Sequence, residues 1–139
     1  GEIMKMFLGE YRPSFTSGKR ISLPKRLREQ ISGSGLVLAK GLEKCLLGYD
    51  RTDWEVEAQK QLTASISDAK ARHLKQYLFS GALEADFDEQ GRVVLPDNLL
   101  QYAGILETVV VIGAGDHFEI WEETAWQAHL EKLEKEVGV

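Results

Sequence analysis

Hydrophobic positions along the chain predict eight short strands that fall into two groups of four. Apolar or alternating runs of about four to eight residues, bounded by glycine, proline and polar turns, are typical of strands. The segments with this pattern are 7–14, 20–23, 36–39, 45–49, 83–87, 92–95, 108–112 and 117–121. Successive segments are close enough to form hairpins, and Gly18 can take the positive φ that the first turn often needs.

A short helix is predicted directly after the second strand of each group. Pro24 and Pro96 stand where these helices begin, because the missing proline N–H has no consequence in a first turn. A serine and glycine run at 32–35 ends the first helix, and Gly104 ends the second. Each group therefore reads as strand, strand, helix, strand, strand.

Three longer helices are predicted from capping patterns. The segments 52–55 and 124–127 have the spacing of a capping box, in which two side chains satisfy free backbone N–H groups. Ser67 is the predicted cap of a linker helix that runs through Phe79. The last helix carries its apolar residues on one stripe: Trp126, Leu130, Leu133 and Val137.

The second group repeats the first at a constant offset of 72 residues. Over 46 ungapped positions, 9–54 against 81–126, ten residues are identical, and most are of types that a backbone constrains strongly. The pairs are Gly9/Gly81, Phe15/Phe87, Arg20/Arg92, Leu23/Leu95, Pro24/Pro96, Leu27/Leu99, Val37/Val109, Gly41/Gly113, Thr52/Thr124 and Trp54/Trp126. The predicted fold class is α+β, with two ββαββ units related by a pseudo-twofold axis and interlocked as a small β-barrel with flanking helices.

Composition favours one compact domain or two half-domains that share a core. The 139 residues are 43% hydrophobic, which is enough to form that core. A single cysteine, Cys45, excludes an intrachain disulfide and suits a reducing cytosol. The longest apolar run, 109–112, is too short to span a bilayer, so no membrane partner is predicted. Because the chain does not open on Met, the natural start is expected at Met4, after residues 1–3, or at Met6, after residues 1–5; otherwise residues 1–5 are expected to be disordered.

Charge divides the chain into a basic front and an acidic rear. Residues 1–30 hold 7 Lys and Arg against 3 Asp and Glu, residues 31–80 hold 7 against 6, and residues 81–139 hold 3 against 13. Six basic residues fall within 17 positions: Arg12, Lys19, Arg20, Lys25, Arg26 and Arg28. Like charges this close repel one another unless an anion lies nearby, so the cluster favours anion binding.

Arg20 and Arg92 hold matching positions just after a turn, but their neighbours differ. Asp88 can form an ion pair with Arg92 across the turn, whereas the residue that matches Asp88 in the first copy is Thr16. Arg20 is therefore the predicted base-reading residue, reaching guanine O6 and N7 from a β-hairpin in the major groove. The predicted phosphate contacts come from Lys19, Lys25, Arg26, Arg28 and Arg12. A symmetric assembly of several chains, each turning its basic front to double-stranded DNA and its acidic rear away, would offset the net charge of −5.

The remaining polar residues do not predict catalysis. The segment 113–115 mimics the start of a dinucleotide-binding loop, but the strand pattern after it predicts a plain hairpin turn. Four residues lack the spacing of metal ligands and are predicted to be structural: Cys45, His73, His117 and His129. No nucleophile, base and orienting group stand in a recognisable arrangement. The sequence thus predicts no enzyme, no cofactor, no metal and no small-molecule substrate.

Four motifs resemble those of the MraZ family of bacterial transcriptional regulators, which are tandem AbrB/SpoVT-type swapped-hairpin barrels. They are Met6-Phe7-Leu8-Gly9-Glu10-Tyr11, Gly18-Lys19-Arg20-Ile21-Ser22-Leu23-Pro24, Asp88-Glu89-Gln90-Gly91-Arg92-Val93-Val94-Leu95-Pro96 and Phe118-Glu119-Ile120-Trp121. The resemblance runs from Met6 to about Leu130. It implies a swapped-hairpin (double-split) barrel with AbrB-like repeats at 6–55 and 81–130, joined by linker helices at 56–80.

The same resemblance implies a function. Family members are regulators that bind repeated G-rich boxes before the division and cell-wall gene cluster, generally their own operon, and that assemble into closed rings. The family signature Asp-x-x-x-Arg is complete from Asp88 to Arg92, while the first copy keeps Arg20 but has Thr16 in place of the acid. A cytoplasmic, nucleoid-associated location is the corresponding expectation.

Two other functions compete with DNA binding. A protein-interaction module, such as an antitoxin-like dimer whose tail blocks an enzyme, would need apolar surface on the tail at 131–139, which is short and mostly charged. An enzyme that binds a small ligand or phosphosugar in the pseudo-twofold cleft would need convergent titratable groups, which the sequence does not indicate.

Overall fold

The computed structural model describes residues 5–16, 19–33 and 35–139. Predictions that concern Gly18, Ser34 and residues 1–4 lie outside these residues. The first half contains β1 (Glu10–Tyr11), β2 (Arg20–Ser22), α1 (Lys25–Arg28), β3 (Leu36–Lys40), β4 (Leu46–Asp50), α2 (Arg51–Leu62) and α3 (Ala69–Ser80). The second half contains β5 (Leu83–Ala85), β6 (Arg92–Val94), α4 (Asp97–Ala103), β7 (Val109–Gly113), β8 (Phe118–Glu122) and α5 (Glu123–Val137).

Most predicted strands are present within a residue or two of their expected ends. The first is the exception, because only β1 and an isolated bridge between Phe7 and Gly115 occur where a strand at 7–14 was expected. Pro13 lies two residues after β1 and has no N–H to donate, so a ladder cannot continue through it.

Strands of both copies interleave in one antiparallel sheet of six strands, in the order β1-β7-β8-β4-β3-β5. β1 pairs with β7 of the other copy, β5 pairs with β3, and β4 pairs with β8 at the centre. β2 and β6 form a separate two-stranded ribbon. At the centres of these pairings each residue faces its own counterpart in the other copy, 72 positions away: Leu47 faces Glu119, and Ile21 faces Val93. A pseudo-twofold axis therefore relates the copies.

Two expectations about strand pairing are wrong. Within the described residues, 7–14 and 20–23 form no ladder, and a single bridge joins Ile21 to Phe15, just after the first segment. The matching segments 83–87 and 92–95 do not pair either, because β5 pairs with β3 and β6 with β2. A closed barrel is not formed by the described residues, since β1 and β5 are the edges of an open sheet and the ribbon is a sheet of its own. The swapped-hairpin arrangement implied by the resemblance stays a prediction.

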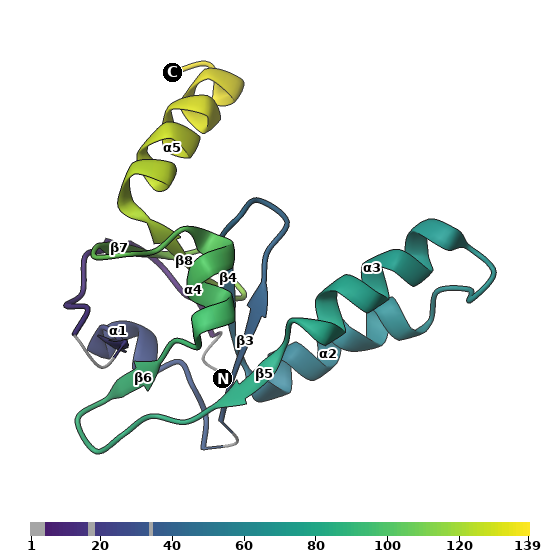
Figure 1. The fold of residues 1–139 in the computed structure, drawn as a ribbon, viewed down its shortest axis with the longest axis horizontal. Helices are drawn as coiled ribbons and strands as arrows, with labels where there is room; N and C mark the ends of the chain where they lie inside the picture. The colour runs from purple at the N-terminus through teal and green to yellow at the C-terminus, as the bar shows by residue number, and fades with distance from the viewer. Residues whose placement is uncertain (1–4, 17–18, 34) are drawn as a thin grey trace.

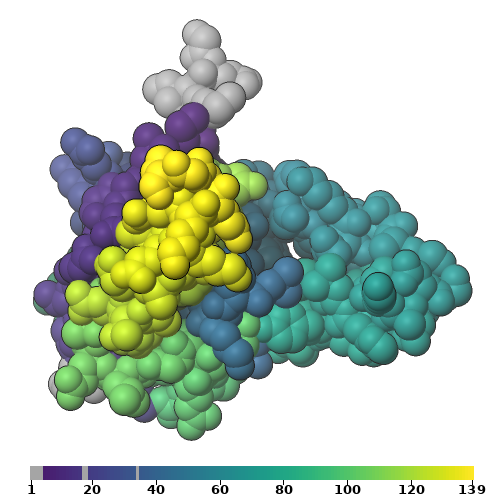
Figure 2. Space-filling view, turned by 90° about the horizontal axis from the view of Figure 1, so that it is seen from above, coloured from purple at the N-terminus to yellow at the C-terminus, as the bar shows by residue number. Residues whose placement is uncertain are grey.

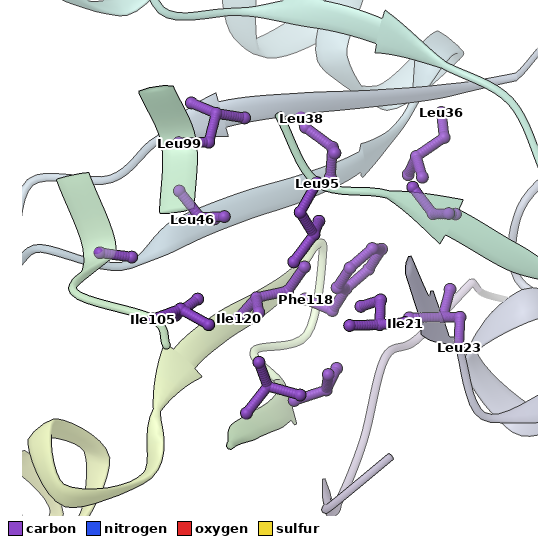
Figure 3. Packing of buried hydrophobic residues seen from close by; sticks show 14 of the residues in the cluster. Ile21, Leu23, Leu36, Leu38, Leu46, Leu95, Leu99, Ile105, Phe118 and Ile120 are labelled. Carbon is purple, nitrogen blue, oxygen red and sulfur yellow. The ribbon is translucent and has the colours of Figure 1, made fainter. Parts of the chain in front are cut away.

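The main core brings residues of the sheet, the ribbon and the short helices together. Figure 3 shows Ile21 of the ribbon, Leu95 directly after ribbon strand β6, and Phe118 of the sheet pointing toward one another, and each is at most 1% exposed. Leu27 of α1 and Leu99 of α4, which are equivalent in the two copies, belong to the same cluster. Each fully buried side chain of this size stabilises the fold by about 1.5–3 kcal/mol. The core therefore fixes the ribbon to the sheet.

The longer helices differ in how they contact the sheet. α5 covers a second buried cluster of Cys45, Val110, Trp121 and Trp126. The hairpin of α2 and α3 projects from the body (Figure 1; teal in Figure 2), and neither helix has a buried residue. Of the helices in the described residues, none is both long enough and apolar enough to cross a membrane.

The predicted helix caps are wrong by one or two positions. α3 is capped by Asp68 rather than Ser67, and α5 is capped by Glu122 rather than Thr124. α2 begins one residue before Thr52, so that threonine is already inside the helix. Asp68 and Glu122 each accept hydrogen bonds from two backbone N–H groups of the first turn, and a negative charge is favoured there by the helix dipole. The predicted end of α4 is confirmed, because Gly104 has φ 66°.

Candidate nucleic-acid interface

The β2–β6 ribbon carries both matching arginines on one face. Ile21 and Val93 are paired at its centre and are buried in the core. Because side chains alternate along a strand, the residues on either side of this pair point to the opposite face. That outer ribbon face consists of Arg20, Ser22, Arg92 and Val94.

The turns that precede the two arginines have equivalent backbone hydrogen bonds. The N–H of Thr16 donates to the carbonyl of Arg20 at 3.0 Å, and the N–H of Asp88 donates to the carbonyl of Arg92 at 2.9 Å. These four residues match at the offset of 72. The described residues at the two ends of each turn are therefore joined by equivalent hydrogen bonds.

The position before each arginine has a left-handed backbone. Lys19 has φ 59° and Gly91 has φ 75°, so the lysine adopts the conformation that glycine holds in the other copy. This costs a non-glycine residue roughly 1–2 kcal/mol. The carbonyl of Lys19 accepts the N–H of Leu95 at 2.8 Å, and that of Gly91 accepts the N–H of Leu23 at 3.3 Å. Reciprocal bonds between the copies thus hold both turns.

The Asp88 side chain lies near residues of both ribbon strands, Arg92 of β6 and Arg20 of β2. Its Oδ1 accepts the N–H groups of Gln90 and Arg92, each at 2.9 Å, and its Oδ2 accepts Nε of Arg92 at 2.9 Å. The N–H and guanidinium of Arg92 together hold the pKa of Asp88 below its ordinary value. The predicted ion pair is present. Nε of Arg20 lies 3.9 Å from the same Oδ2, so the acid near Arg20 comes from the other copy and not from the matching position, which is Thr16.

α1 adds cations directly after the ribbon. Lys25 and Arg26 are exposed on its surface. Arg28 turns back instead, because its Nε donates to the carbonyl of Leu23 at 2.9 Å and its guanidinium packs against Gly91. Nζ of Lys25 lies 3.9 Å from Oε1 of Glu29 at the end of this helix, in a pair that is open to solvent. Lys25 and Arg26 thus face solvent, whereas Arg28 supports the turn of the other copy.

Two cations of the predicted cluster meet carboxylates of the acidic half. Arg12, after β1, has Nε 3.3 Å from Glu123 Oε1 at the start of α5. Lys19 forms an ion pair with Asp97 at the start of α4. At these two positions, as at Arg20 and Asp88, carboxylates of the acidic half therefore lie beside cations of the basic front. Both pairs join exposed side chains, and pairs of this kind are weak because water and salt screen them.

The sequence analysis missed two residues of the outer ribbon face, Ser22 and Val94, and the carboxylate of Asp97 that pairs with Lys19. Ser22 and Val94 are exposed beside the arginines, and 46% of Val94 is accessible to solvent. The signal was available, because each alternates with a buried neighbour on its strand. The role of Asp97 carried no sequence signal, since Lys19 and Asp97 are 78 residues apart.

Two of the four residues predicted to be structural, Cys45 and His117, lie in a polar cluster near β8. The ring nitrogens of His117 lie 2.7 Å from Asp116 and 2.9 Å from Glu119. Burial lowers the pKa of His117, but the two carboxylates outweigh this effect and raise it above its ordinary value. Glu119 also accepts Nε1 of Trp121 at 2.9 Å and contacts Sγ of Cys45 at 3.8 Å. Within the described part of the chain, no three His, Cys, Asp or Glu residues are grouped so that they could hold a metal ion.

Comparison with known proteins gives a consistent result. A family model described as "MraZ protein, putative antitoxin-like" matches residues 6–77 and again 78–137. The chain is 39% identical over 124 residues to a transcriptional regulator MraZ of Limosilactobacillus fermentum, covering 89% of this chain and 86% of that protein. It is 40% identical over 121 residues to the protein of that name from Caldicellulosiruptor bescii, covering 87% and 84%. It is 40% identical over 129 residues to that from Syntrophomonas wolfei, covering 93% and 90%.

Proposed function

The chain belongs to the MraZ family, and from this premise we propose that it is a transcriptional regulator that binds specific DNA sequences through the β2–β6 ribbon. The relatives named above are transcriptional regulators, which supports regulation of transcription rather than catalysis. The observation that carries DNA binding is the outer ribbon face, on which two arginines project from a rigid antiparallel pair of strands.

The ribbon has the shape and the groups that major-groove recognition needs. The major groove of B-DNA admits a two-stranded β-ribbon, and arginine donates two hydrogen bonds to guanine O6 and N7. Arg20 reads guanine in this proposal, and Arg92 lies on the same face two residues along the ribbon. Lys19, Lys25 and Arg26 neutralise phosphates on either side, with a smaller contribution from Arg12 and Arg28.

Several chains act together on double-stranded DNA. With a net charge of −5, one chain binds weakly, and a closed ring that presents several ribbons to repeated boxes raises the effective affinity. The proposed sites are boxes upstream of the division and cell-wall gene cluster, including the promoter of the chain's own operon. The protein would therefore act in the cytoplasm, at the nucleoid, without a cofactor or a small-molecule substrate.

A binding titration tests this proposal. The unsubstituted protein, called the parent below, is titrated onto two DNA duplexes, and binding is followed by fluorescence anisotropy at several salt concentrations. One duplex carries the promoter region upstream of its own gene, and the other is a scrambled sequence. Arg20→Ala is expected to lose about 1–3 kcal/mol of binding to the promoter duplex and to discriminate guanine less well. Lys25→Ala is expected to weaken both duplexes alike and to reduce the salt slope by about one.

Lys70→Ala is the matched control, because Lys70 is exposed on the projecting helix α3. It should bind both duplexes as the parent does. If Arg20→Ala binds the promoter duplex as tightly as the parent, the ribbon is not the reading element.

The family description favours one alternative, an antitoxin-like protein that binds a protein partner. Affinity purification separates the two functions. Recovery of one stoichiometric protein, together with no preference of the parent for the promoter duplex, would favour the antitoxin-like function.

A further inference from the structure

One carboxylate lies between the two arginines of the outer ribbon face. Oδ2 of Asp88 is 2.9 Å from Nε of Arg92, in its own copy, and 3.9 Å from Nε of Arg20, in the other copy. The Asp88 and Arg20 side chains are 32% and 42% exposed, so water screens the longer of the two contacts. Oδ1 is already occupied by the turn, which leaves Oδ2 facing the guanidinium groups.

The first copy supplies no equivalent charge. Thr16 holds the position that matches Asp88, and its hydroxyl donates to the carbonyl of Arg20 at 3.4 Å. A neutral hydroxyl at that place does not attract a guanidinium. Because the two strands are antiparallel about Ile21 and Val93, Asp88 of the second turn comes within reach of Arg20 instead.

We propose that Asp88 is a positioning residue for both arginines, so that one side chain of the second copy sets the direction of the guanine-reading groups of both copies. This inference rests on the proposed function. It predicts that the two copies do not read DNA independently.

Asp88→Asn is the variant that isolates the charge. The amide oxygen of asparagine can still accept the N–H groups that Oδ1 accepts now, so the turn is kept while the attraction to both guanidinium groups is lost. Glu89→Gln is the matched control, because it removes one negative charge from the next residue, for which the described residues show no ion pair. Each variant removes one carboxylate that would repel DNA phosphates, so any general gain in DNA affinity from that loss is the same in both.

The first measurement needs no DNA. Nuclear magnetic resonance of the arginine Nε–H groups in the free, intact protein should show that Asp88→Asn shifts the signals of both Arg20 and Arg92. Glu89→Gln should leave both signals in place. A shift confined to Arg92 would show that Asp88 serves only its own copy and would overturn the inference.

The second measurement is the ratio of affinities for the promoter duplex and for a duplex in which the guanines of its repeated boxes are replaced by adenine. Asp88→Asn should lower this ratio by about 10-fold or more, with the salt slope unchanged, since phosphate contacts are not touched. Glu89→Gln should leave the ratio unchanged. A variant that merely loosened the fold would weaken both duplexes together instead.

Rescue completes the test. Thr16→Asp in the Asp88→Asn background places a carboxylate four residues before Arg20. The N–H of Thr16 donates to the carbonyl of Arg20 as that of Asp88 does to Arg92, so the new carboxylate starts from an equivalent backbone position. This double variant should recover part of the lost ratio. If Asp88→Asn and Glu89→Gln give the same ratio as the parent, the inference is wrong; if the parent itself has no preference for the guanine boxes, the proposed function is wrong.

Discussion

The two copies share a backbone plan, yet equivalent positions carry different interactions. Asp50 and Glu122 match at the offset of 72 and both precede a helix, but Asp50 is fully buried and binds Ser32 and Lys5, whereas Glu122 caps α5 at the surface. Repetition therefore preserved the strands and turns, while each copy acquired its own partners. Substituting equivalent residues in parallel measures how far the copies have diverged.

The largest difference is expected at Gly41 and Gly113, which lie where the first strand of the second hairpin passes into its turn. A methyl group at Gly113 would overlap the backbone of Phe7 and Leu8, whereas one at Gly41 would lie 2.7 Å from Sγ of Cys45. A side chain can shift more easily than a hydrogen-bonded backbone. Gly113→Ala should lower the free energy of unfolding by about 3 kcal/mol, and Gly41→Ala by about 1–2 kcal/mol.

Urea unfolding of both variants at one fixed chain concentration measures these free energies, because assembly makes stability depend on concentration. Equal losses would show that the approach of the N-terminal segment to β7 contributes little.

The next difference concerns the two carboxylates that precede helices. Asp50 Oδ1 accepts the N–H and the hydroxyl of Ser32 at 2.9 and 2.8 Å, and Oδ2 pairs with Lys5. Removing this buried carboxylate loses its hydrogen bonds to Ser32 and its ion pair with Lys5, so Asp50→Ala should cost about 2–3 kcal/mol. Glu122→Ala should cost about 1 kcal/mol, the usual effect of losing a helix cap. The same urea titrations rank the two, and a larger loss for Glu122→Ala would reverse this comparison.

The contribution of Asp50 also depends on pH. Burial raises the pKa of Asp50, but the hydrogen bonds from Lys5 and Ser32 outweigh this effect and leave it below its ordinary value. A carboxyl whose pKa is lower in the folded chain stabilises the fold above its unfolded pKa of about 3.9, and this stability is lost as pH falls toward the folded value. The stability gap between the parent and Asp50→Asn should therefore narrow from pH 7 to about pH 3. A gap that stays constant would show that the charge is not the source.

The repeat made much of the fold predictable, because strand patterns and the two prolines recur at one offset. It did not decide which strands pair. β1 and β2 have the same alternation whether they pair with each other or with β7 and β6, so the choice is made by tertiary packing and by Pro13. The caps failed for a related reason, since the sequence offered a hydroxyl and a carboxylate next to each other at each helix start.

At the candidate site, the sequence placed both arginines correctly after their turns but missed what surrounds them. The contact of Arg20 with Asp88 and the pairing of Lys19 with Asp97 join residues of different copies. Such contacts follow from the relative placement of the copies, which no local pattern encodes. The left-handed backbone of Lys19 is also imposed by this packing, since its carbonyl is held by Leu95.

The smallest difference is expected at the residue before each arginine, and its sign is more informative than its size. Lys19→Gly relieves the left-handed strain but also loses the ion pair with Asp97, so Lys19→Ala, which loses the same pair and keeps Cβ, is the control. At an ordinary helical or extended position alanine is more stable than glycine, because glycine loses more chain entropy on folding. At φ 59° the order should reverse, with Lys19→Gly more stable than Lys19→Ala by about 0.5–1 kcal/mol in urea unfolding. If the alanine variant is the more stable of the two, the first turn does not share the backbone of the second, and the equivalence on which the paired arginines depend is lost.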